Sequence, residues 1–166
     1  MKTLKYSVQL FSLFLGVVTI TAGEDVNLKN NLGLTTGTGS SSEIIVGYTI
    51  WAEEGDNPAA FQANIRVNVP TNATLFQVMQ RAREVDSAFE FSSRVYSGLG
   101  NYITCLCGLC ESPDENRYWM IFQTPAIPDP AQPPGNNLLT PRGVDGMIVK
   151  NGDEFLFWLH HYVWHN

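Results

Sequence analysis

The sequence predicts an α+β fold in which a β-grasp-like mixed sheet packs against one amphipathic helix. Three observations predict it. First, apolar side chains recur at every second position in two runs around a turn-rich link. Second, they then recur at the spacing of a helix. Third, the chain ends in a run that is apolar on both faces of a strand. A hairpin, a single helix, several short strands and a long final strand follow one another as in a β-grasp domain.

A β-hairpin opens the folded part. Apolar side chains recur at period two over residues 43–51, and the same period returns over residues 61–69 until Pro70 ends it. The link at residues 53–58 contains Gly, Asp, Asn and Pro, which favour turns. Two such runs around a turn predict a pair of antiparallel strands.

The apolar period then changes to that of a helix. Thr74, or Asn72 just upstream, is a suitable N-cap because its side-chain oxygen accepts a hydrogen bond from an amide of the first turn. We predict one amphipathic helix of about three turns. Its apolar stripe lies at i, i+3, i+4, i+7 and i+10: Leu75, Val78, Met79, Ala82 and Val85.

Short strands follow the helix, at residues 89–96, 102–106 and 118–122. A Pro-rich stretch over residues 125–141 then interrupts the strand pattern. Proline has no amide donor for a sheet, so we expect this stretch to form a surface loop.

The last part of the chain predicts a brief strand, a tight turn and a long strand. Residues 147–149 form the brief apolar run, and Asn151-Gly152 is a pair typical of a type I′ turn. Residues 154–164 are apolar on both faces of a strand. Such a strand is expected in the centre of the sheet or beneath a loop.

The first residues have the pattern of a secretory signal peptide. Lys2 and Lys5 precede an apolar run over residues 8–20, and small residues at 21–23 predict cleavage before Glu24. The run is shorter than the roughly 20 residues that a membrane-spanning helix needs. We therefore expect residues 1–23 to be a signal peptide and the protein to be secreted and extracellular.

One folded domain is expected at residues 43–166, after a flexible linker at 24–42 that is rich in Asn, Gly, Ser and Thr. A glycosylation sequon begins at Asn72, which fits the secretory route. Tripeptides of this kind also recur by chance, so an unused sequon is the alternative.

Charge and motifs exclude several classes of function. The chain carries 10 basic and 16 acidic residues, a formal net charge of −6. This charge repels phosphate backbones and anionic lipids, so we expect neither nucleic acid as a partner nor insertion into membranes. The sequence has no phosphate-binding glycine loop, Gly-x-Ser-x-Gly motif or His-Glu-x-x-His motif, and we expect no enzyme and no catalytic cofactor.

Three cysteines lie within six positions. If Cys107 and Gly108 form a two-residue hairpin turn, Cys105 faces Cys110 across the strands at a spacing that suits a disulfide. We therefore predict a Cys105–Cys110 disulfide, with Cys107 left as a free thiol exposed at the tip. A metal–thiolate cluster is the alternative.

The histidines His160, His161 and His165 are not expected to form a metal site. Neighbours on a strand point to opposite faces, and residues 161 and 165 would lie about 13 Å apart along one strand. We predict no metal site in this tract.

Four local patterns occur in order along the domain. They are the helix segment at 74–82, Phe89-Glu90-Phe91 followed by residues 98–104, Tyr118-Trp119 with Phe122, and Gly143-Val144-Asp145 running into residues 149–154. In order and spacing they resemble the C-terminal β-domain of the cobalamin carriers, the intrinsic factor and transcobalamin family. The resemblance covers about 120 residues, nearly all of the expected domain.

This resemblance implies a β-grasp domain that caps one side of a corrinoid ligand, while a helical barrel in the full carriers holds the other side. We expect this chain to lack the barrel, which leaves three alternatives: its affinity for the corrinoid is modest, a second protein supplies the missing half of the site, or the domain binds another ligand. Aromatic residues at strand spacing alternatively belong to the core. Carried over residue by residue, the resemblance nominates as ligand-binding Leu99, Gly100, Tyr102, Trp119, Phe122 and Leu139, with Leu138 beside the last.

The sequence thus supports two hypotheses. The first is a secreted, non-enzymatic carrier that binds cobalamin or a related corrinoid as its ligand. The alternative is a secreted interaction or structural module that has kept the scaffold and lost corrinoid binding. Such a module would use Cys107 and an exposed strand edge for protein contacts.

Overall fold

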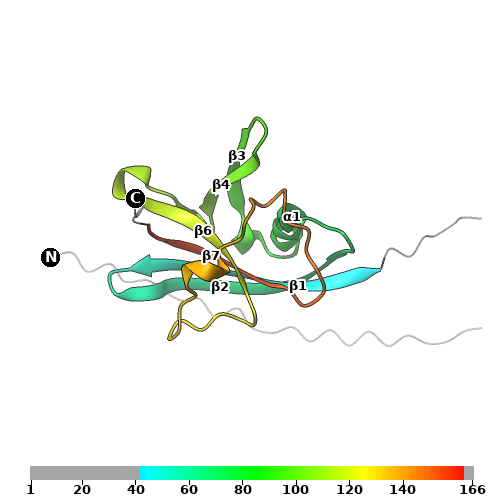
Figure 1. The fold of residues 1–166 in the computed structure, drawn as a ribbon, viewed down its shortest axis with the longest axis horizontal. Coiled ribbons are helices and arrows are strands. Elements are labelled where there is room, and N and C mark those ends of the chain that lie inside the picture. Colours follow the sequence, from blue (N-terminus) through cyan, green and yellow to red (C-terminus); the bar gives the residue numbers. More distant parts are fainter. Residues whose placement is uncertain (1–41, 163–166) are drawn as a thin grey trace, which may run out of the picture. The chain divides into compact units, whose positions relative to one another are not determined.

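A four-stranded mixed sheet forms the centre of the fold (Figure 1). The structure is a computed structural model, and it describes residues 42–162. The predicted signal peptide, nearly all of the predicted linker and residues 163–166 lie outside the described residues.

The described chain alternates between strands and short helical segments. Its strands are β1 (Glu43–Glu54), β2 (Asn57–Pro70), β3 (Phe91–Tyr96), β4 (Gly100–Leu106), β5 (Leu109–Cys110), β6 (Arg117–Thr124) and β7 (Glu154–His161). Its α-helix is α1 (Leu75–Val85), and short 3₁₀ turns are η1 (Ser87–Phe89), η2 (Pro113–Glu115) and η3 (Asn136–Leu138).

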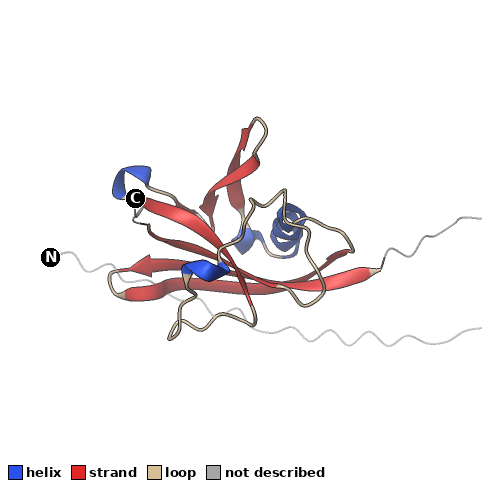
Figure 2. Cartoon of the chain, in the orientation of Figure 1, coloured by secondary structure: helices blue, strands red, loops and turns tan. Residues whose placement is uncertain are grey.

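The main sheet has the strand order β2-β1-β7-β6. Its two central strands, β1 and β7, pair in parallel, whereas β2 and β6 pair antiparallel with them at the edges. Figure 2 shows the one long helix lying on one side of this sheet. A parallel central pair with antiparallel neighbours and a helix across one face is the β-grasp arrangement, so the predicted α+β fold is confirmed.

Helix α1 begins with a capping box. The Thr74 hydroxyl accepts a hydrogen bond from the Gln77 amide at 3.3 Å, and the Gln77 side chain accepts one from the Thr74 amide at 2.8 Å. These bonds satisfy two amides of the first turn that have no partner within the helix. Val85, at the end of the predicted stripe, is 55% exposed. The buried face of the helix is formed by Leu75, Val78, Met79 and Ala82.

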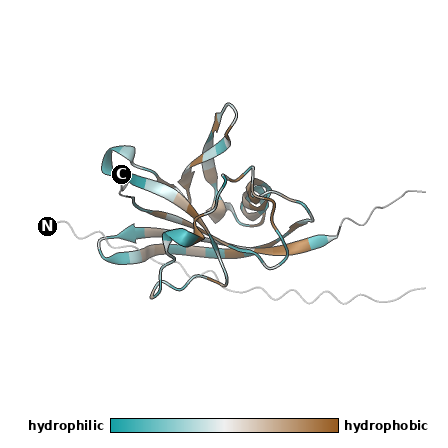
Figure 3. Ribbon diagram, in the orientation of Figure 1, coloured by the Kyte–Doolittle hydropathy of each residue, from teal (hydrophilic) through white to brown (hydrophobic). Residues whose placement is uncertain are grey.

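Each face of the main sheet has its own cluster of buried apolar side chains. The larger cluster joins the sheet to α1, and its central aromatic residues are Tyr48 and Phe157. The smaller cluster, around Trp51 and Trp158, lies on the opposite face together with Leu138 and Leu139 of the Pro-rich loop. Figure 3 shows hydrophilic residues at the turn between β1 and β2 and hydrophobic ones where the strands pass beneath α1. Both faces of the two central strands are therefore covered.

A second, three-stranded sheet is formed by β3, β4 and β5. The β3–β4 hairpin extends away from the main sheet on the side that carries α1 (Figure 1). It is tied back to the helix by a contact between the rings of Phe76 and Phe91, whose centroids are 5.6 Å apart. This contact holds the base of the hairpin, while its tip extends away from the main sheet.

Three sequence expectations near the end of the chain need correction or completion. Residues 147–149 form no strand; Ile148 makes only an isolated bridge with Thr74. Asn151-Gly152 is not a type I′ turn, because such a turn needs a positive φ at both residues. Only Gly152 has one, of 84°. The Gly152 amide instead donates to the Ile45 carbonyl, which fixes the loop against β1. The last strand ends at His161 within the described chain.

A glycine in β1 allows an ion pair to cross the central strand. Gly47 pairs with Arg66 on β2 and with Glu154 on β7. The Arg66 guanidinium forms an ion pair with the Glu154 carboxylate, whose side chain is only 5% exposed. A Cβ at position 47 would overlap that carboxylate. The glycine is therefore needed for space and not for an unusual backbone angle.

We predict that Gly47→Ala lowers the free energy of unfolding by about 2–4 kcal/mol, because the new methyl group displaces the buried Glu154 carboxylate from Arg66. Urea denaturation measures the change. Gly143→Ala is the matched control, since a Cβ at that position meets nothing within 4 Å, and it should change stability by less than about 0.5 kcal/mol. Equal effects of the two substitutions would contradict the crossing ion pair.

Candidate functional site

The β3–β4 hairpin exposes apolar side chains at its tip. Leu99 is 82% exposed and Val95 is 78% exposed. The turn between them closes with a hydrogen bond from the Leu99 amide to the Tyr96 carbonyl at 3.1 Å. Gly98 and Gly100 have φ of 78° and 84°, a backbone region that side chains with a Cβ rarely adopt. The two glycines therefore turn the chain so that Leu99 points into solvent.

Tyr96 and Tyr102 form an aromatic wall beside this tip. Their ring centroids are 5.9 Å apart and the rings meet edge to face. A groove of about 400 Å³ runs along the wall between the hairpin and the segment that follows β5. Arg94, Glu111 and Pro113 also line it. We refer to this cavity as the hairpin groove.

Tyr102 and Glu111 form the polar element of the hairpin groove. The Tyr102 hydroxyl donates a hydrogen bond to Oε2 of Glu111. Partial burial, and then this bond to a carboxylate, raise the pKa of Tyr102 well above its usual value. The phenol therefore stays protonated at all physiological pH values, and it acts as a hydrogen-bond donor and an apolar surface.

The base of the hairpin is held by a carboxylate from another part of the chain. Asp145 accepts hydrogen bonds from the Asn101 amide and from Nδ2 of Asn101, the latter at 3.0 and 3.2 Å. A Cβ on Gly100 would overlap the Asp145 carboxylate, so this close approach requires glycine. The loop that carries Asp145 is in turn bonded to the start of α1, where the Phe76 amide donates to the Val144 carbonyl at 3.1 Å.

Trp119 lies beneath the hairpin groove and is only 6% exposed. Together with Tyr102, Ile121 and Val144 it lines a small cavity of about 70 Å³. Its indole Nε1 is buried and has no hydrogen-bond partner in the part of the chain that the structure describes. Tyr102 lines both cavities, so the hairpin groove and the smaller cavity adjoin at this residue.

Phe122 and Leu139 lie on the other face of the main sheet. They form an isolated bridge with each other, and Phe122 is 1% exposed. Positions 119 and 122 are an odd number of residues apart on β6, so their side chains point to opposite faces. The structure thus brings Leu99, Gly100, Tyr102 and Trp119 to one side, and it places Phe122 and Leu139 away from them.

Several residues of the hairpin groove were not nominated from the sequence. Tyr96 shares the strand alternation of β3 but lies outside the quoted patterns, and Arg94 and Glu111 carry no local signal. Glu111 reaches Tyr102 because it directly follows β5, which pairs with β4. Only the pairing of the strands, and no sequence spacing, reveals this contact.

The cysteines form the predicted disulfide, Cys105–Cys110, with a Cα separation of 4.0 Å. Cys107 and Gly108 have φ of 52° and 77°, as a two-residue type I′ turn requires. Cys107 is not exposed at the tip as expected: its side chain is half-buried, packed against the larger core cluster. The reason is that the turn folds back on the core, where the Cys107 amide donates to the Glu90 carbonyl at 2.9 Å.

The histidine tract is divided between two environments. His160 stacks on Trp158 with ring centroids 4.2 Å apart, and burial lowers its pKa. His161 instead contacts Glu53 at 2.6 Å, and His165 lies outside the described residues. Within residues 42–162 no three His, Cys, Asp or Glu side chains are grouped to hold a metal ion, and no helix there is both long and apolar enough to cross a bilayer.

Comparison with solved structures finds a similar fold in part of haptocorrin. The chain is similar to haptocorrin in a crystal structure of its complex with Cbi, with a TM-score of 0.58 and 22% identity. The similarity covers 74% of this chain and 26% of the haptocorrin chain. The predicted resemblance to a domain of the cobalamin carriers is therefore confirmed at the level of the fold.

A relative is also found by sequence. Over 138 residues the chain is 33% identical to the Drosophila melanogaster protein CG3556, which is described as uncharacterized. The match covers 80% of this chain and 22% of that protein, so the chain spans about a fifth of its relative's length. No protein-family model matches the chain.

We predict that Glu111→Gln lowers the pKa of Tyr102 toward that of an ordinary tyrosine, because the amide removes a negative charge that opposes phenolate formation. Ultraviolet absorption at alkaline pH follows the titration, and Tyr102→Phe identifies which transition belongs to this residue. Glu90→Gln, which lies outside the groove, is the control. An unchanged Tyr102 titration in Glu111→Gln would rule out the hydrogen bond.

We predict slow alkylation of Cys107 in the folded protein. Burial, and then the nearby Asp86 carboxylate, raise the pKa of this thiol to about 11, so at pH 8 its thiolate fraction is roughly 100-fold below that of a free cysteine. Mass spectrometry with iodoacetamide compares the native and urea-unfolded protein. Similar rates in both would show that the thiol is exposed.

Proposed function

We propose that this protein is a secreted, non-enzymatic binding protein that holds cobalamin or a related corrinoid in the hairpin groove. The observation that carries the proposal is the open groove beside Leu99 and Tyr102, on the hairpin that the resemblance to the cobalamin carriers nominates. The shared fold with part of haptocorrin, a protein crystallised with Cbi, supports the same ligand class.

The surface of the hairpin groove suits a flat ring edged with amides. Leu99, Tyr96 and Tyr102 offer apolar and aromatic contact, which is the main component of small-molecule sites. The Arg94 side chain makes no hydrogen bond or ion pair in the described part of the chain, and only one oxygen of Glu111 is bonded to Tyr102. An amide edge has both a carbonyl acceptor for Arg94 and N–H donors for Glu111.

The hairpin groove offers one wall to such a ligand. Because Leu99 is 82% exposed at the tip, a flat molecule resting there keeps its other face accessible. We propose that a second protein covers that face. Trp119 then acts as the support beneath Tyr102, and Phe122 and Leu139 stabilise the opposite side of the sheet.

The compartment follows from the same proposal. A Cys105–Cys110 disulfide is of the kind that persists in oxidising, extracellular surroundings. Asn72 is exposed in the turn before α1, where an attached glycan meets no core residue. We therefore propose a secreted glycoprotein in which residues 1–23 are the signal peptide for export. Residues 24–42 form a linker that precedes the domain, and residues 43–166 form the domain that binds the ligand.

A second candidate is a protein-interaction module. The observation that favours it is the exposure of Val95 and Leu99, since apolar side chains on a projecting hairpin also suit a protein partner. The interaction-module hypothesis requires the Cys107 thiol to contact a partner protein. Cys107 is half-buried, which disfavours this hypothesis.

We predict that the purified protein retains hydroxocobalamin or dicyanocobinamide on gel filtration, with a shift in the visible spectrum of the corrinoid. Leu99→Ser should weaken binding by about tenfold or more, since burying a leucine side chain contributes about 1.5–3 kcal/mol. Ile127→Ser is the matched control: Ile127 is 55% exposed but belongs to the Pro-rich loop.

Two results would count against the corrinoid proposal. If Ile127→Ser weakens binding as much as Leu99→Ser, the ligand does not lie in the hairpin groove. If neither corrinoid co-elutes with the protein, the interaction module becomes the better explanation of the exposed hairpin.

A further inference from the structure

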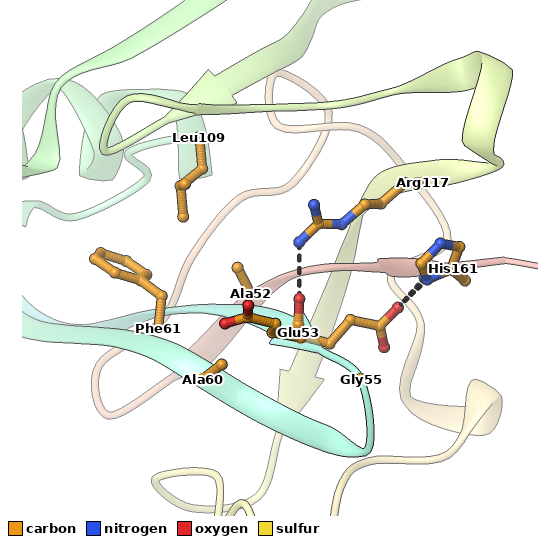
Figure 4. Close-up of a pocket in the computed structure, with 9 residues that line it drawn as sticks. Ala52, Glu53, Gly55, Ala60, Phe61, Leu109, Arg117 and His161 are labelled. Carbon is orange, nitrogen blue, oxygen red and sulfur yellow. Dashed lines mark hydrogen bonds and ion pairs between the residues drawn. The ribbon is translucent and has the colours of Figure 1, made fainter. Parts of the chain in front are cut away.

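A second cavity, of about 390 Å³, lies at the other end of the main sheet, where the β1–β2 turn, the start of β6 and the end of β7 meet (Figure 4). It shares no lining residue with the hairpin groove. Its volume is within the range of about 300–1,000 Å³ that small-molecule sites occupy. We refer to it as the turn cavity.

A β-bulge brings two adjacent carboxylates to the turn cavity. The register between β1 and β2 shifts between Ala52, which pairs with Phe61, and Glu54, which pairs with Asn57. Neighbouring residues of a regular strand point to opposite faces, but a bulge changes this alternation and redirects a side chain. Glu53 and Glu54 consequently both line the cavity.

Glu53 is already occupied by contacts within the protein. Its carboxylate lies 2.6 Å from Nδ1 of His161 and also accepts a hydrogen bond from the His161 main-chain amide. Its carbonyl accepts a bond from Nη2 of Arg117 at 2.8 Å. Both contacts with His161 use Oε1 of Glu53, so Glu53 anchors the end of β7 and orients Arg117 through one oxygen and its carbonyl.

Arg117 and Glu54 are the charged groups that remain available. The Arg117 side chain makes no hydrogen bond in the described chain other than the one to the Glu53 carbonyl, and its Nε is buried without an acceptor. Glu54 is exposed and its side chain has no partner among the described residues. Beside the anchored Glu53, the cavity thus presents one positive side chain, Arg117, and one negative side chain without a partner, Glu54.

The remaining wall of the turn cavity is apolar. Figure 4 shows Phe61 and Leu109 at one end of the cavity, and Arg117 and His161 at the other. Phe61 and Leu109 are both partly buried against the core. An occupant therefore meets an apolar surface on one side and charges of both signs on the other.

We propose that the turn cavity binds a small zwitterion with an apolar side group, of the chemical class of the hydrophobic α-amino acids. The ligand carboxylate pairs with Arg117, its ammonium group pairs with Glu54, and its side group packs between Phe61 and Leu109. A plain anion meets repulsion from Glu53 and Glu54, and a plain cation meets repulsion from Arg117. Only a ligand with both charges satisfies both groups.

The test uses ¹H–¹⁵N spectra of the full chain titrated with L-leucine, N-acetyl-L-leucine and L-leucinamide. L-leucine should shift amide signals of residues at the β1–β2 turn and the start of β6. Removing either ligand charge should weaken binding by about tenfold or more, because each removal breaks a charge-assisted hydrogen bond.

Two substitutions separate the two charges. Glu54→Gln should make N-acetyl-L-leucine bind as well as L-leucine, and it leaves the fold intact because the Glu54 side chain has no partner within the described chain. Arg117→Gln should do the same for L-leucinamide. Glu43→Gln and Arg94→Gln are matched controls, since they remove the same charges outside the turn cavity.

Three outcomes would overturn the assignment: no localised shifts with L-leucine, equal binding of all three ligands to the unaltered protein, or loss of discrimination in the control variants. None of these bears on corrinoid binding, because the hairpin groove and the turn cavity have no lining residue in common. The two proposals are therefore tested separately.

Discussion

The parallel pairing of β1 with β7 is the constraint on which the rest of the structure depends. Six residue pairs, from Gly47–Glu154 to Ala52–Leu159, join the first and last strands in the centre of the main sheet. A strand buried on both faces needs apolar side chains on both, and Phe155 to Leu159 supply them. The same pairing brings His161 to Glu53 and thereby forms the turn cavity.

The two faces of the main sheet are covered by different elements of the chain. One face is closed by α1 and the β3–β4 hairpin, and the other by the Pro-rich loop through Leu138 and Leu139. The face beneath the Pro-rich loop carries the smaller cluster around Trp51 and Trp158. The helix side carries an element that extends beyond the core, and the exposed apolar groove lies there.

Much of the fold could be predicted from local patterns, because period and capping are local properties. The stripe of α1 with its Thr74 cap and the Cys105–Cys110 pairing follow from spacing alone. Long-range contacts could not be predicted this way. Gly152 takes its conformation in a loop bonded to Ile45, and Cys107 is half-buried because its turn meets Glu90.

The candidate site shows the same division. Leu99, Gly100 and Tyr102 are nominated by the family resemblance, whereas Asp145 and Glu111 enter through tertiary contacts. That Trp119 and Phe122 face opposite ways follows from strand alternation, a local rule that the family resemblance alone does not include. Combining both rules at the sequence level would have separated these two residues.

The contacts at the base of the β3–β4 hairpin affect how well its exposed tip can bind a ligand. Elements that bury their own apolar side chains are stabilised by that burial, which contributes about 25 cal/mol per Å². The tip of the β3–β4 hairpin leaves Leu99 and Val95 in solvent, and its base is fixed by the Phe76–Phe91 contact and by the hydrogen bonds that Asp145 accepts from Asn101. A rigid base beneath an exposed apolar tip lowers the entropic cost of binding, because the surface is already ordered before a ligand arrives. This arrangement contributes little to folding, and it is what a preformed binding surface requires.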